Sequence, residues 1–213
     1  MSSSEYSIWD ILQFGDFIPL TTSIDSSVKQ DIKKFDNKFT KYNPRDNIPR
    51  DGLCIINERG ETGPGPALDS LKQYNAENNT EWGETDFNKP TEIYYESNAV
   101  NNLLKDIKHW CVRTHFIKLR PGGYFPPHRD HSKGIQNTFR LIVPIYNCNP
   151  PFCRFMLEDN TLNFDHTKMY FINTTKQHSL FNASPKRDSM WLIVNALLCK
   201  DSIDWVIDNL DAK

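Results

Sequence analysis

Two histidines and one aspartate are the residues whose types and spacing could bind a metal ion. His128 and Asp130 belong to the segment PPHRDHS at 126–132, and His178 stands in the later segment QHS. If 126–132 is a strand, His128 and Asp130 share a face, because alternate side chains of a strand point the same way. Neutral imidazole nitrogens and an anionic carboxylate oxygen form a ligand mixture that suits non-haem iron.

The third ligand has to come from a distant strand, because a facial triad needs a donor opposite the first pair. His178 falls in a short strand expected at 177–181, and antiparallel pairing would bring it beside the other two residues. The His-x-Asp spacing is weak by itself, since charged surface strands produce it by chance, and the later histidine strengthens it. We therefore predict that His128, Asp130 and His178 are metal ligands and catalytic residues.

Arg187 and Ser189 stand at the beginning of an apolar strand expected at 189–198. A buried guanidinium needs an anionic partner. Arg187 is therefore a candidate to bind a ligand carboxylate, with the Ser189 hydroxyl as a second donor. The alternative places Arg187 in a solvated turn after Pro185 and Lys186.

The first half of the chain is expected to form helices and loops. Apolar residues recur at helical spacing over 26–35 and over 97–110, and Ser97 is a suitable N-cap for the second helix. The stretch 43–88 is rich in Asn, Gly, Pro and charged residues, and we expect long loops there with a short helix at 68–74.

The second half reads as short strands rich in Ile, Val, Phe and Tyr, separated by Pro and Gly turns. This pattern favours a sandwich or jelly roll. We expect the strands at 115–120, 138–146, 152–157, 169–173, 177–181 and 189–198, followed by a helix at 202–210.

The chain is expected to fold as a single domain over 1–213. In this interpretation 1–111 is a part made of helices and loops that packs on the outside of the core. The core, which holds the metal site, spans 112–199, and a C-terminal helix lies in 200–213.

Composition narrows the class of protein. The chain has 213 residues, 38% of them hydrophobic and 24% charged, which is typical of a globular protein. A formal net charge of -2 argues against a general nucleic-acid binder.

We find no signal peptide and no apolar run near the roughly 20 residues that span a bilayer. Five cysteines without a CxxC pair indicate reduced thiols, so we expect a cytoplasmic protein without membrane contact. Its oligomeric state is not predicted.

A family resemblance rests on three stretches of the second half. FIKLRPGGYFPPHRDHS, TFRLIVPIY and QHSLFNASPKRDSMWLIVNAL together resemble the aspartyl/asparaginyl β-hydroxylase branch of the 2-oxoglutarate oxygenases, which includes free amino-acid hydroxylases such as proline cis-hydroxylases. The resemblance covers roughly 115–198. The first half resembles no family, and substrate selection is expected to reside there.

The resemblance implies a mainly β fold with flanking helices, namely a double-stranded β-helix (jelly roll, cupin-like). It implies an Fe(II) site at His128, Asp130 and His178, with 2-oxoglutarate and O2 as cosubstrates and ascorbate as a candidate reductant. Arg187 matches the arginine that holds 2-oxoglutarate, and Arg140 matches a second arginine that helps to hold it. Some members of the branch have Gly where Asp130 stands, so this chain carries the fuller ligand set.

The implied activity is a dioxygenase that hydroxylates an amino acid, or an amino-acid side chain in a peptide. Two alternatives stay open on the sequence. One is a jelly-roll metal-binding protein without oxygenase activity, and the other is a cupin-type enzyme that does not use 2-oxoglutarate.

The segment 50–71 is unusual because a Gly-Pro-Gly-Pro run stands among charged residues. It could be a lid in which Arg50, Arg59 or Glu61 meets a polar substrate, or a plain solvated loop. His115 is expected to be a packed core histidine.

Overall fold

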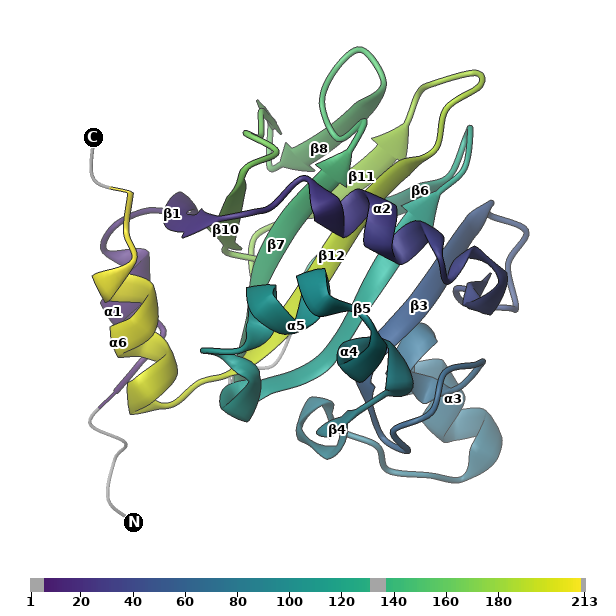
Figure 1. Cartoon of the computed structure of the whole chain (residues 1–213), viewed down its shortest axis with the longest axis horizontal. Coiled ribbons are helices and arrows are strands. Elements are labelled where there is room, and N and C mark those ends of the chain that lie inside the picture. Colours follow the sequence, from purple (N-terminus) through teal and green to yellow (C-terminus); the bar gives the residue numbers. More distant parts are fainter. Residues whose placement is uncertain (1–5, 131–136, 212–213) are drawn as a thin grey trace.

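Two β-sheets lie face to face in the computed structural model, which describes residues 6–130 and 137–211 (Figure 1). The larger sheet has the strand order β1 (Phe17–Ser23), β10 (Lys168–Ile172), β7 (Thr138–Tyr146), β12 (Ser189–Leu197), β5 (Cys111–Leu119), β3 (Arg50–Asn57) and β2 (Thr40–Lys41), with β4 (Lys89–Pro90) paired to β3. The smaller sheet has the order β6 (Tyr124–His128), β11 (His178–Asn182), β8 (Cys153–Leu157) and β9 (Asn160–Leu162).

From β5 onward the chain passes repeatedly between the two sheets. β5, β7, β10 and β12 belong to the larger sheet, whereas β6, β8, β9 and β11 belong to the smaller one. This alternation produces a double-stranded β-helix, so the predicted fold class, mainly β with flanking helices, is confirmed.

Apolar side chains fill the space between the sheets. Phe155 and Leu180 of the smaller sheet belong to the same buried cluster as Trp191 and Ile193 of β12. The Trp191 ring lies 5.8 Å from that of Phe155, and Trp191 has no exposed surface. Trp191 and Ile193 are two residues apart in β12, and alternate side chains of a strand point to the same face.

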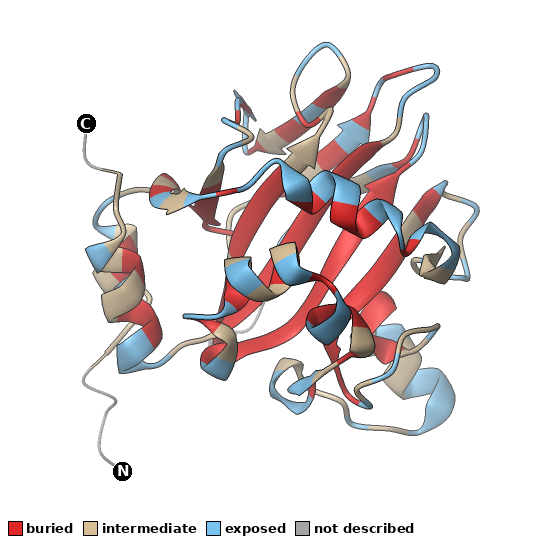
Figure 2. Ribbon diagram, viewed as in Figure 1, coloured by how far each residue is buried: buried red, intermediate tan, exposed pale blue. Residues whose placement is uncertain are grey.

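Helices cover the outer face of the larger sheet, and Figure 2 shows that the strands beneath them are buried. α2 (Ser27–Lys33), α4 (Glu92–Glu96) and α5 (Asn98–Leu104) lie across this face, and α1 (Trp9–Leu12) lies beside α6 (Lys200–Asp208) at one end (Figure 1). α3 (Leu71–Asn78) completes the helices of the described residues. None of these helices is long and apolar enough to cross a membrane.

The predicted helix boundaries need small corrections. Helix 97–110 is shorter than expected, because α5 ends at Leu104 and a 3-10 turn follows at Lys108–Trp110. Ser97 is its N-cap as predicted, accepting a hydrogen bond from the Val100 N–H at 3.2 Å. The helix expected at 68–74 lies later, at Leu71–Asn78, after a 3-10 turn at Pro66–Leu68.

The prediction that 43–88 consists of loops is wrong at β3. Arg50–Asn57 pairs with β5 along its length, and seven of its eight residues are buried. Both faces of this strand are covered, so it lacks the alternation that marks a half-exposed strand, and its polar start Arg-Asp-Gly resembles a turn. The expectation that 1–111 contains only helices and loops is therefore wrong too, since β1 to β4 come from it.

Candidate metal centre

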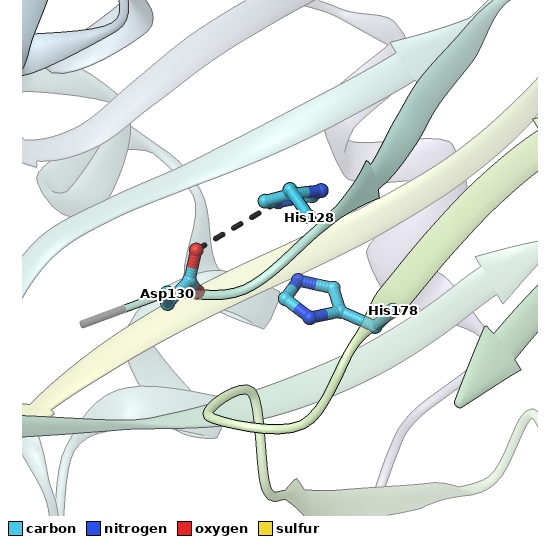
Figure 3. Close-up of side chains that lie close together, drawn as sticks. All are labelled: His128, Asp130 and His178. Atoms are coloured by element: carbon cyan, nitrogen blue, oxygen red, sulfur yellow. Dashed lines mark ion pairs between the residues drawn. The ribbon is translucent and has the colours of Figure 1, made fainter. Parts of the chain in front are cut away.

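Strand pairing brings the two predicted histidine ligands together. His128 is the last residue of β6 and His178 the first of β11, and the two are register partners in the antiparallel ladder. Their ring centroids are 4.2 Å apart. Asp130 lies just beyond the end of β6, where its N–H donates to the Thr174 carbonyl at 2.9 Å. The side chains of the three residues point toward one another (Figure 3), and one donor atom from each lies within 4.8 Å of the others.

Both histidines are oriented by a carbonyl two residues earlier in the chain. His128 Nδ1 lies 2.7 Å from the Pro126 carbonyl oxygen, and His178 Nδ1 lies 3.1 Å from that of Lys176. A carbonyl can only accept, so Nδ1 carries a proton in each ring and Nε2 is the nitrogen left for a metal. Metal-binding histidines usually have this arrangement, because the hydrogen bond fixes both tautomer and ring orientation.

The two oxygens of the Asp130 carboxylate have different neighbours. Oδ2 accepts a hydrogen bond from Arg140 Nε at 2.5 Å, while Oδ1 lies 3.7 Å from His128 Nε2. Burial opposes ionisation of this carboxyl, but Arg140 and the two histidines outweigh burial and hold the pKa of Asp130 well below its ordinary value. Burial also lowers the pKa of His178, so this ring is neutral near pH 7. The site therefore offers two imidazole nitrogens and one anionic oxygen, which fits a divalent metal.

A cavity of about 890 Å³ opens beside the three residues. This volume is in the range of small-molecule sites. Its wall combines apolar side chains with cations, among them the buried Arg50 and Arg113 and the partly buried Arg140. Arg50 reaches it from β3 and not from a lid, and Arg59 and Glu61 are not among the residues that line it.

Of the three residues predicted to hold the cosubstrate, the structure brings only Arg140 to this cavity. The Arg187 side chain is exposed, with its guanidinium carbon 4.7 Å from the centre of the Phe152 ring, as the solvated-turn interpretation expects. Ser189 is buried in β12, and its hydroxyl lies 3.5 Å from Cys153 Sγ. Neither Arg187 nor Ser189 lines the cavity.

Arg113 and His115 also line the cavity, and neither was predicted from the sequence to do so. They lie two residues apart in β5. Arg113 donates to the Glu84 carboxylate at 2.7 Å and to backbone carbonyls of 66–69. Burial, and then Arg113, lowers the pKa of His115 well below its ordinary value, so the ring is neutral. The available signal was an Arg and a His two residues apart in one strand, which places both on one face.

Comparison with solved structures addresses the fold. A 2-oxoglutarate/Fe(II) oxygenase family protein from Burkholderia pseudomallei matches 92% of this chain and 93% of its own, with a TM-score of 0.51 and 9% identity. This chain shares its fold.

Two further solved structures match over most of the chain. A Pseudomonas putida prolyl-4-hydroxylase covers 90% of this chain and 96% of its own, with a TM-score of 0.49 and 14% identity. A viral collagen prolyl hydroxylase from Paramecium bursaria Chlorella virus 1, in complex with 2-oxoglutarate, covers 89% and 99%, with a TM-score of 0.47 and 9% identity. No family model matches the sequence. No curated protein matches it either.

Proposed function

We propose that this chain is an Fe(II)- and 2-oxoglutarate-dependent oxygenase that hydroxylates an amino acid, or an amino-acid side chain in a peptide. One observation carries the proposal. A nitrogen from each of two histidines and a carboxylate oxygen converge within 4.8 Å beside a cavity, in a fold shared with an oxygenase of this type. Two histidines and one carboxylate on one face of an iron ion leave its remaining positions open to small ligands.

His128, Asp130 and His178 would hold the iron. When bound, Fe(II) supplies the means to activate O2 with electrons from the oxidative decarboxylation of 2-oxoglutarate, so that a C–H bond of the substrate is oxidised. The chain contributes orientation. The carbonyls of Pro126 and Lys176 direct both Nε2 atoms at the metal position, and Arg140 fixes the Asp130 carboxylate.

Arg140 is the best-supported residue for the distal carboxylate of 2-oxoglutarate. It lies in the cavity wall beside Asp130, and only its Nε is used in the contact with that carboxylate. A guanidinium has five N–H donors, so others remain for a cosubstrate. The exposed position of Arg187 gives no comparable support.

The size and lining of the cavity support a second small ligand beside the cosubstrate. Its volume of about 890 Å³ exceeds what a five-carbon diacid needs. Aromatic and aliphatic side chains stand next to cations in its wall, which suits a molecule with a short carbon skeleton and polar ends. An amino acid or a peptide side chain has these features.

The test is succinate formation by protein loaded anaerobically with Fe(II) and then given 2-oxoglutarate, O2 and a panel of amino acids. We expect turnover that a subset of the panel stimulates, and none in the His128→Ala or Asp130→Ala variants. Slow turnover that no amino acid stimulates would support the reaction class and direct the search to peptides. Absence of turnover in a protein that binds the metal would reject the proposal in favour of a metal-binding jelly roll or a cupin-type enzyme that does not use 2-oxoglutarate.

A further inference from the structure

Unsatisfied polar atoms are concentrated around the cavity. Among the residues described, seven buried side-chain nitrogen or oxygen atoms lack a hydrogen-bond partner, and four of the seven belong to cavity-lining residues, namely Asn43, Arg50, His115 and Thr174. Buried donors and acceptors are normally paired, because an unpaired one keeps its full desolvation cost. Among the residues described, the cavity wall is therefore the region richest in unpartnered buried polar atoms.

Arg50 is the charged member of this group and is 5% exposed. Its terminal nitrogens donate to Asp46 Oδ2 at 2.6 Å and to the Tyr124 carbonyl at 3.1 Å, while its Nε has no partner. Two aromatic rings flank the guanidinium, whose central carbon lies 4.3 Å from the centre of Phe125 and 5.4 Å from that of Tyr42. The guanidinium is therefore held in place by its neighbours, and some of its N–H donors remain unused.

The buried Arg113 and the partly buried Arg140 also belong to the wall and are already engaged. Every nitrogen of Arg113 donates, to Glu84 or to backbone carbonyls. Arg140 uses its Nε on Asp130 and stands beside the metal position, where we place the cosubstrate. Among these three, Arg50 is the one left to meet another anion.

One aromatic ring neighbours both Arg50 and the candidate metal ligand His128. The centroid of the Phe125 ring lies 6.4 Å from that of His128 and 4.3 Å from the Arg50 guanidinium carbon. A molecule anchored at Arg50 would extend along an apolar ring toward the reactive centre. Strands β5 and β12 lie between β3, which carries Arg50, and β7, which carries Arg140, so an anion at Arg50 would be separated from a cosubstrate carboxylate at Arg140.

We propose that Arg50 binds a carboxylate of the substrate and so makes this site selective for carboxylic acids, with the carbon skeleton lying on Phe125 and its reactive end facing the metal. The proposal rests on the proposed function for the identity of the reaction. The carboxylate is either the α-carboxylate of a free amino acid or the side-chain carboxylate of an acidic residue in a peptide.

Binding measurements test this without requiring turnover. Calorimetric titration of the Mn(II)- and 2-oxoglutarate-loaded protein, and of the protein alone, would use the twenty L-amino acids, their C-terminal amides, and N-acetylated, C-amidated Asp and Glu. We expect binding of a subset of the free acids and about 10- to 100-fold weaker binding of their amides, since a charge-assisted pair is lost. If the blocked Asp or Glu binds in place of the free amino acids, the carboxylate comes from a peptide side chain.

Variants then assign the effect to Arg50. Arg50→Gln should weaken acid binding about 10- to 100-fold and abolish the difference between acid and amide, and Arg50→Lys should fall between. Arg120→Gln is the matched control, because Arg120 is an exposed arginine paired with Asp51 at 2.7 Å outside the cavity. Asp46→Asn removes the internal competitor and should tighten acid binding, which keeps the test open if Arg50→Gln does not fold.

Several results would overturn the proposal. They are equal binding of acids and amides by the wild-type protein, an unchanged acid-to-amide ratio in Arg50→Gln, and binding of no carboxylate in the panel. Weaker binding of 2-oxoglutarate itself in Arg50→Gln, with the panel unaffected, would place the cosubstrate at Arg50 and contradict the assignment. Because succinate formation is measured separately, these results are distinct from a failure of the proposed oxygenase activity.

Discussion

Arg140 links the carboxylate of Asp130, a candidate metal ligand, to the larger sheet. It is a β7 residue whose Nε holds Asp130 Oδ2 at 2.5 Å, which leaves Oδ1 on the side of His128. Outer contacts of this kind commonly change metal affinity about 10- to 100-fold when they are removed. Arg140 therefore has two expected roles, orienting a metal ligand and binding the cosubstrate.

Replacing each of the two candidate arginines in turn tests which of them binds 2-oxoglutarate. Arg140→Ala should raise the KM for 2-oxoglutarate about 10- to 100-fold, because a charge-assisted pair with the distal carboxylate is lost. Arg187→Ala should leave it within about twofold, since this side chain is exposed on Phe152. Metal affinity measured without 2-oxoglutarate distinguishes the two roles of Arg140. A strong rise in KM for Arg187→Ala alone would return the cosubstrate to the residue expected from the sequence.

The convergence of His128, Asp130 and His178 was predictable from the sequence, whereas the cavity wall was not. A strand period of two, a later strand histidine and the family resemblance pointed to these three residues, although Asp130 lies beyond the strand and is positioned by the Thr174 carbonyl. Arg50 could be singled out only as one of several polar residues in an unusual segment. Its role depends on pairing between distant strands, which one sequence does not reveal.

At the scale of elements, a buried carboxylate ties two helices together. Asp31 of α2 accepts hydrogen bonds from the Ser97 hydroxyl at 2.7 Å and from the Ala99 N–H at 3.1 Å, at the start of α5. Lys34 forms an ion pair with the same carboxylate. Ser97 in turn caps α5, so one carboxylate fixes both the beginning of this helix and its position on α2.

Asp31→Asn should therefore destabilise the protein by about 1.5–3 kcal/mol at pH 7, the usual range for hydrogen bonds to a charged group. Burial raises the pKa of Asp31, but its hydrogen bonds and Lys34 outweigh burial and lower the pKa below the ordinary 3.8. The contribution of Asp31 to the free energy of unfolding is therefore complete above its ordinary pKa and is lost as the pH falls through its lower pKa in the folded state. Urea unfolding at pH 7 and at about pH 3 would show the difference between wild type and variant shrinking in acid.

Asp204→Asn is the control for the stability change predicted for Asp31→Asn. Asp204 pairs with Lys200 on the exposed surface of α6, where such pairs contribute about 0–1 kcal/mol. An equal loss of stability in the two variants, or a difference for Asp31→Asn that does not depend on pH, would contradict the role given to the buried carboxylate.

The strands of the second half were predictable because their apolar runs are bounded by Pro and Gly turns. β7 was predicted at its observed bounds, and β8, β10, β11 and β12 within one residue, whereas β5 begins at Cys111, before its predicted start at 115, and β9 was not predicted. β3 was not, because it is covered on both faces and begins with Arg-Asp-Gly. Its place beside β5 is decided by long-range pairing, which overrides the local composition.

At the scale of the whole molecule, metal binding should stabilise the fold. The three predicted ligands come from β6, β11 and the residues after β6, and Asp130 is joined to the larger sheet through Arg140. An ion that binds only the folded state adds about 2.7 kcal/mol at a concentration of 100 times its Kd. For a chain of this size we expect Mn(II) to raise the Tm by about 5–10 °C under these conditions.

His128→Ala should abolish this rise in Tm, and His109→Ala should keep it, because His109 lies in the 3-10 turn before β5 and not at the cavity. Differential scanning calorimetry with and without Mn(II) makes the comparison. A rise of equal size in His128→Ala would mean that the stabilising ion binds elsewhere.

The most direct test of the central claim is a crystal structure of the protein grown anaerobically with Fe(II) and 2-oxoglutarate, with the iron located by its anomalous scattering. We predict one iron bonded to His128, Asp130 and His178, with the distal carboxylate of 2-oxoglutarate on Arg140. Iron bound at other residues, or no iron at these three side chains under saturating Fe(II), would contradict the account.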